Sequence, residues 1–223
     1  MEIPLLDFIY KIRYDVSNKT IQFTGAVMKE KKAVFTIALI VINIAVFAVE
    51  TIAGGSENTQ VALKFGAAYA PLVFSGDYYR LFTAMFLHFG AFHLLMNMIS
   101  LGVLGPAVEK LFGKIRFLLI YLIGGIVGNV LSMYLDVWLD RNALSAGASG
   151  AIFALFGAYL VMALSKKFTG LSVPRVLIAI VISLVPGFEM HSINMTAHLG
   201  GLIGGFIVSL ILLPTVGKKR RLK

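Results

Sequence analysis

Six apolar stretches, separated by short polar segments, constrain the fold of this chain more than any other feature of its sequence. They cover residues 33–49, 91–108, 117–135, 149–164, 171–188 and 193–213. Stretches of this length approach what an α-helix needs to cross the hydrocarbon core of a bilayer. Inside a bilayer the backbone must satisfy its own hydrogen bonds, which favours helices. We therefore predict an all-α, polytopic membrane protein, built as a bundle of six transmembrane helices.

The composition agrees with this fold class. The chain has 223 residues, of which 58% are hydrophobic and 14% are charged, and its mean hydropathy is +0.87. A soluble domain would carry more charge on its surface. The chain has no cysteine, which excludes disulfides, thiolate metal sites and a cysteine nucleophile.

The polar segments define the expected organisation of the chain. Residues 1–32 are mixed and charged, unlike a secretory signal peptide, and we interpret them as a cytoplasmic N-terminal appendage. Residues 33–214 are expected to form the six-helix membrane core, and residues 215–223 a basic cytoplasmic tail. The long loop 53–87 contains the segment 81–87, which is too short to span a membrane but apolar enough to dip into its interface.

The basic residues orient the predicted helices. Of the 20 Lys and Arg residues, 17 lie in the N-terminal segment, the loops 108–116 and 165–175, and the C-terminal tail. The positive-inside rule then predicts that both termini lie on the cytoplasmic side of a cell membrane, the inner or plasma membrane. The same distribution explains the net charge of +9 without a nucleic-acid partner. The tail is expected to contact anionic lipid head groups of the bilayer.

Polar side chains in three of the predicted helices lie at a similar depth. In this orientation the second, fourth and sixth helices all run from outside to inside. The second carries His93 and Asn97 in its first two turns, the fourth begins at Ser149, and the sixth carries His198 close to its start. Polar residues within a membrane usually face the bundle interior or a water-filled cavity, and they mark function. The sequence therefore predicts one site that opens to the extracytoplasmic side.

Ser149 lies at the centre of a run of small residues, within 145–153. Gly147 and Gly150 remove side chains on both sides of the hydroxyl, so another helix or a substrate backbone can approach it closely. The alternative is a small-residue packing face, which membrane helices use often. The polar residues on the other helices favour a functional serine.

His198 is the candidate base for this serine. A serine hydroxyl is a weak nucleophile until a base removes its proton, and imidazole titrates near neutral pH. The glycines that follow His198 allow its helix to approach Ser149. We assign Asp136 and Asp140 to a solvated outer loop, so no acidic residue is expected to complete a triad. The sequence predicts a serine–histidine dyad.

The second helix supplies candidate hydrogen-bond donors. His93 and Asn97 are four residues apart and share one helix face. Together with the backbone N–H of Ser149, they can donate to a developing oxyanion, as acyl transfer requires. The alternative is a hydrogen-bonded pair that only holds this helix in place. His88, at the boundary between loop and membrane, is expected to support the site, and His191 is interpreted as a loop histidine.

These motifs resemble the rhomboid intramembrane serine proteases, over about residues 33–214. The resemblance is carried by His88, His93 and Asn97; by Gly147, Ser149 and Gly150; by His198 within Ala197-His198-Leu199-Gly200-Gly201; and by Gly105, Glu109 and Gly113. It implies a rhomboid-like six-helix bundle in which the serine is the nucleophile and the sixth-helix histidine is the base. The second-helix histidine and asparagine would help to bind the oxyanion, and residues 186–194 would form a mobile cap. Substrates would be single-span membrane proteins, cut in or near the membrane segment, and no cofactor or metal is expected.

The chain departs from the family pattern at two places. Tyr79-Arg80 stands where the family often has Trp-Arg. Phe153 stands where some members stack a tyrosine on the catalytic histidine, and it can stack but cannot donate a hydrogen bond. Neither departure removes a catalytic group.

Two other classes of protein are alternatives to a protease. A transporter or channel could use the histidines as proton or metal ligands, but the spans are expected to lack buried carboxylates, because Glu50 and Glu109 lie near span ends. A non-catalytic chaperone on the same scaffold predicts a lost serine or histidine, and both are present. The sequence itself sets no oligomeric state.

Overall fold

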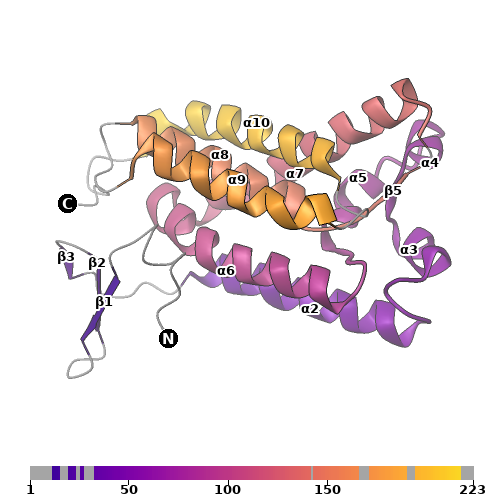
Figure 1. The fold of residues 1–223 in the computed structure, drawn as a ribbon, viewed down its shortest axis with the longest axis horizontal. Helices are drawn as coiled ribbons and strands as arrows, with labels where there is room; N and C mark the ends of the chain where they lie inside the picture. The colour runs from indigo at the N-terminus through magenta and orange to yellow at the C-terminus, as the bar shows by residue number, and fades with distance from the viewer. Residues whose placement is uncertain are drawn as a thin grey trace.

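The computed structural model describes residues 12–15, 20–23, 26–27, 33–141, 143–165, 171–189 and 194–216. Its long helices are α2 (Val34–Ile52), α6 (Ala91–Phe112), α7 (Lys114–Trp138), α8 (Ser149–Leu164), α9 (Val173–Glu189) and α10 (Met195–Leu212). They pack side by side as one bundle (Figure 1). The predicted all-α class is confirmed.

Within the described residues, four helices are long and apolar enough to cross a membrane: α2, α6, α7, and α10 together with the short helix η2 (Leu213–Thr215). The apolar helices α8 and α9 are shorter. The chain is therefore a multi-pass membrane protein, with a helix at the place of each predicted span. The main difference in length is in α7, which begins three residues earlier and ends three residues later than predicted.

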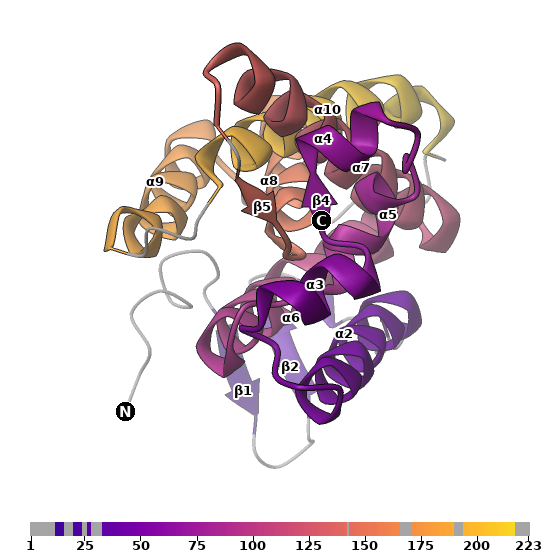
Figure 2. The same cartoon turned by 90° about the vertical axis from the view of Figure 1, so that its right-hand side faces the viewer.

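The long loop between α2 and α6 is folded (Figure 2). It contains α3 (Thr59–Phe65), β4 (Ala68–Tyr69), α4 (Ala70–Phe74), α5 (Arg80–Thr83) and η1 (Ala84–Phe86). Arg80 holds it together: its guanidinium donates to the carbonyl oxygens of Leu63 (2.8 Å) and Ala67 (3.3 Å) and pairs with Asp77 at 2.9 Å. Arg80 is buried whereas Tyr79 is exposed, so the arginine makes the docking contacts in this Tyr-Arg pair.

A two-stranded sheet ties this loop to the segment that leads into α8. Strand β4 pairs antiparallel with β5 (Leu144–Ser145), with Ala68 opposite Ser145. The backbone N–H of Gly147 also donates to the carbonyl oxygen of Ala84 at 2.9 Å. These bonds fix the backbone just before Ser149.

The N-terminal segment contains a small sheet that the sequence did not indicate. Strands β1 (Ile12–Asp15), β2 (Thr20–Phe23) and β3 (Ala26–Val27) pair antiparallel in that order. Figure 1 shows them outside the helical bundle.

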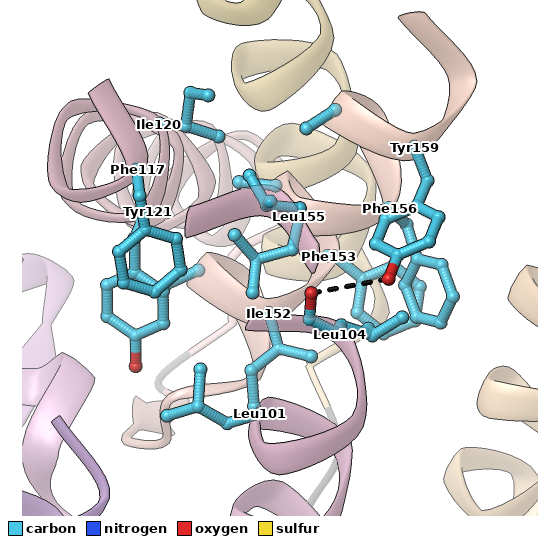
Figure 3. Close-up of a cluster of buried hydrophobic side chains, with 14 of the residues drawn as sticks. Leu101, Leu104, Phe117, Ile120, Tyr121, Ile152, Phe153, Leu155, Phe156 and Tyr159 are labelled. Atoms are coloured by element: carbon cyan, nitrogen blue, oxygen red, sulfur yellow. Dashed lines mark hydrogen bonds between the residues drawn. The ribbon is translucent and has the colours of Figure 1, made fainter. Parts of the chain in front are cut away.

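Helix α8 lies at the centre of the bundle. Its aromatic side chains Phe153, Phe156 and Tyr159 pack in a buried cluster with side chains of α6 and α7, which include Leu104 and Tyr121 (Figure 3). The hydroxyl of Tyr159 donates to the carbonyl oxygen of Leu104 at 3.4 Å. Inside a membrane, apolar side chains gain little by leaving lipid for another helix. Close packing and hydrogen bonds such as these therefore stabilise the association of the helices.

Glycines bring the backbones of α7, α8 and α10 into contact. A Cβ atom at Gly201 would overlap the carbonyl oxygen of Gly150, and one at Gly128 would lie 2.6 Å from the carbonyl oxygen of Ala197. Such distances leave no room for any side chain. The joint between α8 and α10 is therefore made directly by main-chain atoms.

The expectation that the spans lack buried carboxylates is wrong. Glu50, Glu109 and Asp136 all lie within helices and are almost completely buried. Asp136 is not in a solvated loop because α7 extends past it to Trp138. Each carboxylate has a local partner: Glu109 accepts hydrogen bonds at the start of α2, Glu50 accepts from the backbone N–H of His88, and Asp136 lies 3.5 Å from the hydroxyl of Ser132.

Candidate active site

Ser149 and His198 meet at one end of the central helices. Ser149 is the first residue of α8, and His198 lies in the first turn of α10. The Oγ atom of Ser149 and the Nε2 atom of His198 are 2.8 Å apart. The close approach of Gly201 to Gly150 brings the two helices near enough for this contact. A hydroxyl at hydrogen-bond distance from an imidazole is the geometry that base-assisted nucleophiles need.

Phe153 fixes the plane of the histidine ring. It lies one turn after Ser149 on α8, and its ring stacks on His198 with centroids 4.2 Å apart and planes 7° apart. Nδ1 of His198 is buried and has no hydrogen-bond partner among the described residues. Asp136 does not take this place, because its carboxyl group accepts from the hydroxyl of Ser132. Among the described residues, His198 thus contacts a serine hydroxyl through Nε2 and an aromatic ring through its face, with no carboxylate on Nδ1.

Gly147 lets the ring of His93 lie close to the serine. Its φ of +138° suits glycine, and a Cβ atom there would lie 2.9 Å from Nε2 of His93 and 3.7 Å from Oγ of Ser149. The His93 ring therefore occupies the space that a side chain at residue 147 would need, close to Oγ of Ser149. Gly150 sits on the other side, where a Cβ atom would lie 3.4 Å from the carbonyl oxygen of Ala197.

Asn97 is buried on the same face of α6 but bonds to its own helix. Its Nδ2 atom donates to the carbonyl oxygen of His93 at 3.0 Å. The structure thus brings His93 to the serine, while the Asn97 amide is engaged with backbone in this state. Catalytic hydrogen bonds are often loose before substrate binds and tighten in the complex.

His88 supports the backbone that precedes the serine. It is fully buried, its ring packs edge-on against His93 with centroids 5.2 Å apart, and its Nε2 atom accepts a 3.5 Å hydrogen bond from the backbone N–H of Ala148. Burial, and to a smaller extent the neighbouring His93, lower the pKa of His88 to about 3. His88 therefore stays neutral near pH 7 and keeps a lone pair for this bond.

Sequence reasoning missed three polar residues beside the dyad: Asn194, Ser132 and Ser145. The side chain of Asn194 contacts the other two hydroxyls. Asn194 is the second residue of the predicted sixth helix, and the available signal was that asparagine is a favoured N-cap, which would have moved the start of that helix to Met195. His191 and residues 190–193 of the expected cap lie outside the described residues. No group of three His, Asp or Glu side chains in the described part of the chain is placed to hold a metal ion.

Together, the fold and the site define a multi-pass helical membrane protein in which a partly buried serine contacts a buried histidine. Comparison with known proteins gives the family: the model of the Rhomboid domain matches residues 75–215. The chain belongs to the rhomboid family.

Several relatives with curated names cover much of this chain. Rhomboid protease GluP of Bacillus subtilis (strain 168) is 41% identical over 196 residues, which are 86% of this chain and 38% of GluP. The putative rhomboid protease YdcA of the same organism is 42% identical over 151 residues, 67% of this chain and 73% of YdcA. Rhomboid protease AarA of Providencia stuartii is 29% identical over 206 residues, 80% of this chain and 73% of AarA. The chain thus spans well under half the length of GluP.

Proposed function

We propose that this chain is an intramembrane serine endopeptidase that cleaves single-span membrane proteins in or near their transmembrane segment. The observation that carries the proposal is the 2.8 Å contact between Oγ of Ser149 and Nε2 of His198, inside a helical membrane bundle. The names of GluP and AarA as rhomboid proteases support it.

In the proposed reaction His198 acts first as a base and then as an acid. Its Nε2 atom takes the proton from Ser149 Oγ while that oxygen attacks the carbonyl carbon of the scissile peptide bond. The imidazolium then gives this proton to the leaving amine, and an acyl-enzyme remains on Ser149. Water, deprotonated by the same imidazole, hydrolyses the ester and restores the serine. Phe153 keeps the ring in the plane that both transfers need.

The oxyanion would form beside Ser149, close to Gly147 and His93. The backbone N–H of Ser149 begins α8, where N–H groups have no partner within the helix. The His93 ring lies next to Gly147, where a Cβ atom would meet both that ring and Oγ of Ser149. Asn97 would join them by exchanging its bond to the His93 carbonyl oxygen for one to the oxyanion. Donors fixed in advance around a developing charge contribute strongly to acyl transfer.

The orientation follows from the basic residues. With 17 of 20 on one side of the predicted topology, both termini would lie in the cytoplasm and the site would open to the extracytoplasmic side of an inner or plasma membrane. In this organisation residues 1–32 form a cytoplasmic appendage, residues 33–214 the protease core, and residues 215–223 a basic tail at the lipid surface.

The two rival functions are less well supported. The three buried carboxylates each bond to a nearby backbone or hydroxyl group, which makes them structural and not free carriers for a transporter or channel. A non-catalytic chaperone has no need for a serine and a histidine at hydrogen-bond distance.

Labelling with a fluorophosphonate probe tests the proposal directly. The purified protein in detergent should be phosphonylated and should cleave a model single-span substrate. Ser149→Ala and His198→Ala should each abolish both activities while remaining folded. Ser209→Ala is a matched control, because Ser209 is also a buried helical serine but lies outside the site. Labelling that persists in Ser149→Ala would refute the nucleophile assignment.

A further inference from the structure

The side chain of Asn194 connects the two elements that carry the dyad. Its Oδ1 atom accepts a 3.0 Å hydrogen bond from the backbone N–H of Ala197, so it caps the N-terminus of α10. Its Nδ2 atom donates to Oγ of Ser132 in α7 and, at 3.2 Å, to Oγ of Ser145 in β5. One amide group therefore joins α10, α7 and the segment that leads into α8.

The position of Asn194 in the sequence makes this connection relevant to the dyad. His198 follows it by one helical turn, and the backbone N–H of His198 donates to the Asn194 carbonyl oxygen at 3.2 Å. Ser145 precedes Ser149 by four residues. Asn194 is thus bonded on one side to the helix that holds the base and on the other to the strand that leads to the nucleophile.

A buried hydroxyl fixes which way the amide points. Ser132 is fully buried, and its Oγ atom lies 3.5 Å from Oδ2 of Asp136. Ser132 donates to that carboxyl group and offers a lone pair of its oxygen to the amide nitrogen of Asn194. The amide oxygen is then left to cap α10. If the oxygen and nitrogen of the amide were exchanged, the NH2 group would face the backbone N–H of Ala197 and the cap would be lost.

We infer that Asn194 is a positioning residue, which sets the separation of Ser149 and His198 by tying the first turn of α10 to Ser132 and Ser145. It does not touch the reacting atoms. The inference rests on the proposed function, because it assigns a role in the same reaction. Loss of the Asn194 side chain should slow the reaction considerably, because a displacement of about 1 Å between reacting groups can lower the rate about 100-fold.

The test separates positioning from general stability. Asn194→Ala removes the cap and the tie, whereas Asn194→Asp keeps the cap oxygen and can still accept from the Ser145 hydroxyl. Each variant is compared with wild type by kinact and KI for the fluorophosphonate, by kcat and KM for a model single-span substrate, and by thermal unfolding. All rates are expressed per titrated active site. Asn58→Ala is the matched control, because Asn58 caps α3 in the same way, far from the dyad in sequence.

For Asn194→Ala we expect kinact and kcat to fall about 10- to 100-fold, with KI and KM within about twofold of wild type. Asn194→Asp should recover part of the loss, and Asn58→Ala should leave all four constants unchanged. Wild-type kinact in Asn194→Ala, or an equal loss in Asn58→Ala, would overturn the inference. If Asn194→Ala does not fold, the pair Ser132→Ala and Ser145→Ala replaces it, and unchanged constants in both would overturn the inference as well. Failure of wild type itself to react with the probe would instead count against the proposed function.

Discussion

Phe153 and His198 stack face to face, with their ring centroids 4.2 Å apart. Both rings are buried, and the helix that presents the phenylalanine is the one that begins with Ser149. The proposed nucleophile and the ring that stacks on the proposed base therefore belong to the same helix. Any tilt of α8 therefore moves Ser149 and Phe153 together and leaves the distance between them unchanged.

Removing the stacked ring should slow the chemical step. In Phe153→Ala the imidazole loses an aromatic contact of about 0.5–1.5 kcal/mol, so kinact per active site should fall about 2- to 12-fold. The variant should also unfold at a lower temperature, because deleting a buried phenylalanine side chain costs about 3–5 kcal/mol. Phe153→Tyr keeps the stack and serves as the control. A Phe153→Ala enzyme with unaltered kinact would show that the stack does not orient the base.

Asn97 separates oxyanion binding from simple helix packing. If it donates to the oxyanion, Asn97→Ala should slow acyl transfer by up to about 10²–10³-fold, with a modest change in thermal stability, since interhelical hydrogen bonds in membranes average about 0.6 kcal/mol. Asn129→Ala is the matched control, because that buried amide also donates to a backbone carbonyl, that of Leu81, at 2.8 Å. A variant that melts early yet turns over normally when folded would make Asn97 a structural residue only.

The rate should depend on pH through the base. His198 must be neutral to accept the serine proton, so kcat/KM should decline as pH falls through protonation of the imidazole. His88 does not contribute to this decline above about pH 4, because its pKa is lowered to about 3. The measurement is the pH dependence of cleavage between about pH 4 and 8, the range in which histidines titrate. A flat profile across this range would argue against histidine as the base.

The orientation can be tested with single cysteines, since the chain has none of its own. Cysteines at the exposed positions Thr59 and Asp140 should react with an impermeant thiol reagent added outside intact cells. Cysteines at Ser17 and Lys219 should react only after the membrane is opened. The inverse pattern would place the site on the cytoplasmic side.

The sequence predicted the helices and the proximity of Ser149 to His198, because these follow from apolar length and from depth along the helices. Apolar length marked the spans, and equal depth in three parallel helices brought Ser149, His198 and His93 together. It misplaced Asp136 because the end of an apolar stretch does not mark the end of a helix: α7 continues to Trp138 and buries the carboxylate beside Ser132.

Two further features could not be predicted from apolar length or helical spacing alone. The Asn97 amide bonds to the His93 carbonyl oxygen of its own helix, which helical spacing alone does not reveal. The partners of Asn194 come from residues 62 and 49 positions away in the chain. Only the packed arrangement of α7, β5 and α10 brings them within reach.

Because Gly201 and Gly150 touch through main-chain atoms, neighbouring positions of α10 should differ strongly in the substitutions that they accept. At Gly201 even a methyl group would overlap a carbonyl oxygen, so every substitution there must push α8 and α10 apart and separate Ser149 from His198. Two residues away on either side, Leu199 and Ile203 are exposed on the surface of the bundle, where lipid accepts almost any apolar side chain. A saturation library across this helix should therefore alternate between positions that accept nothing and positions that accept nearly any apolar residue, within a single turn.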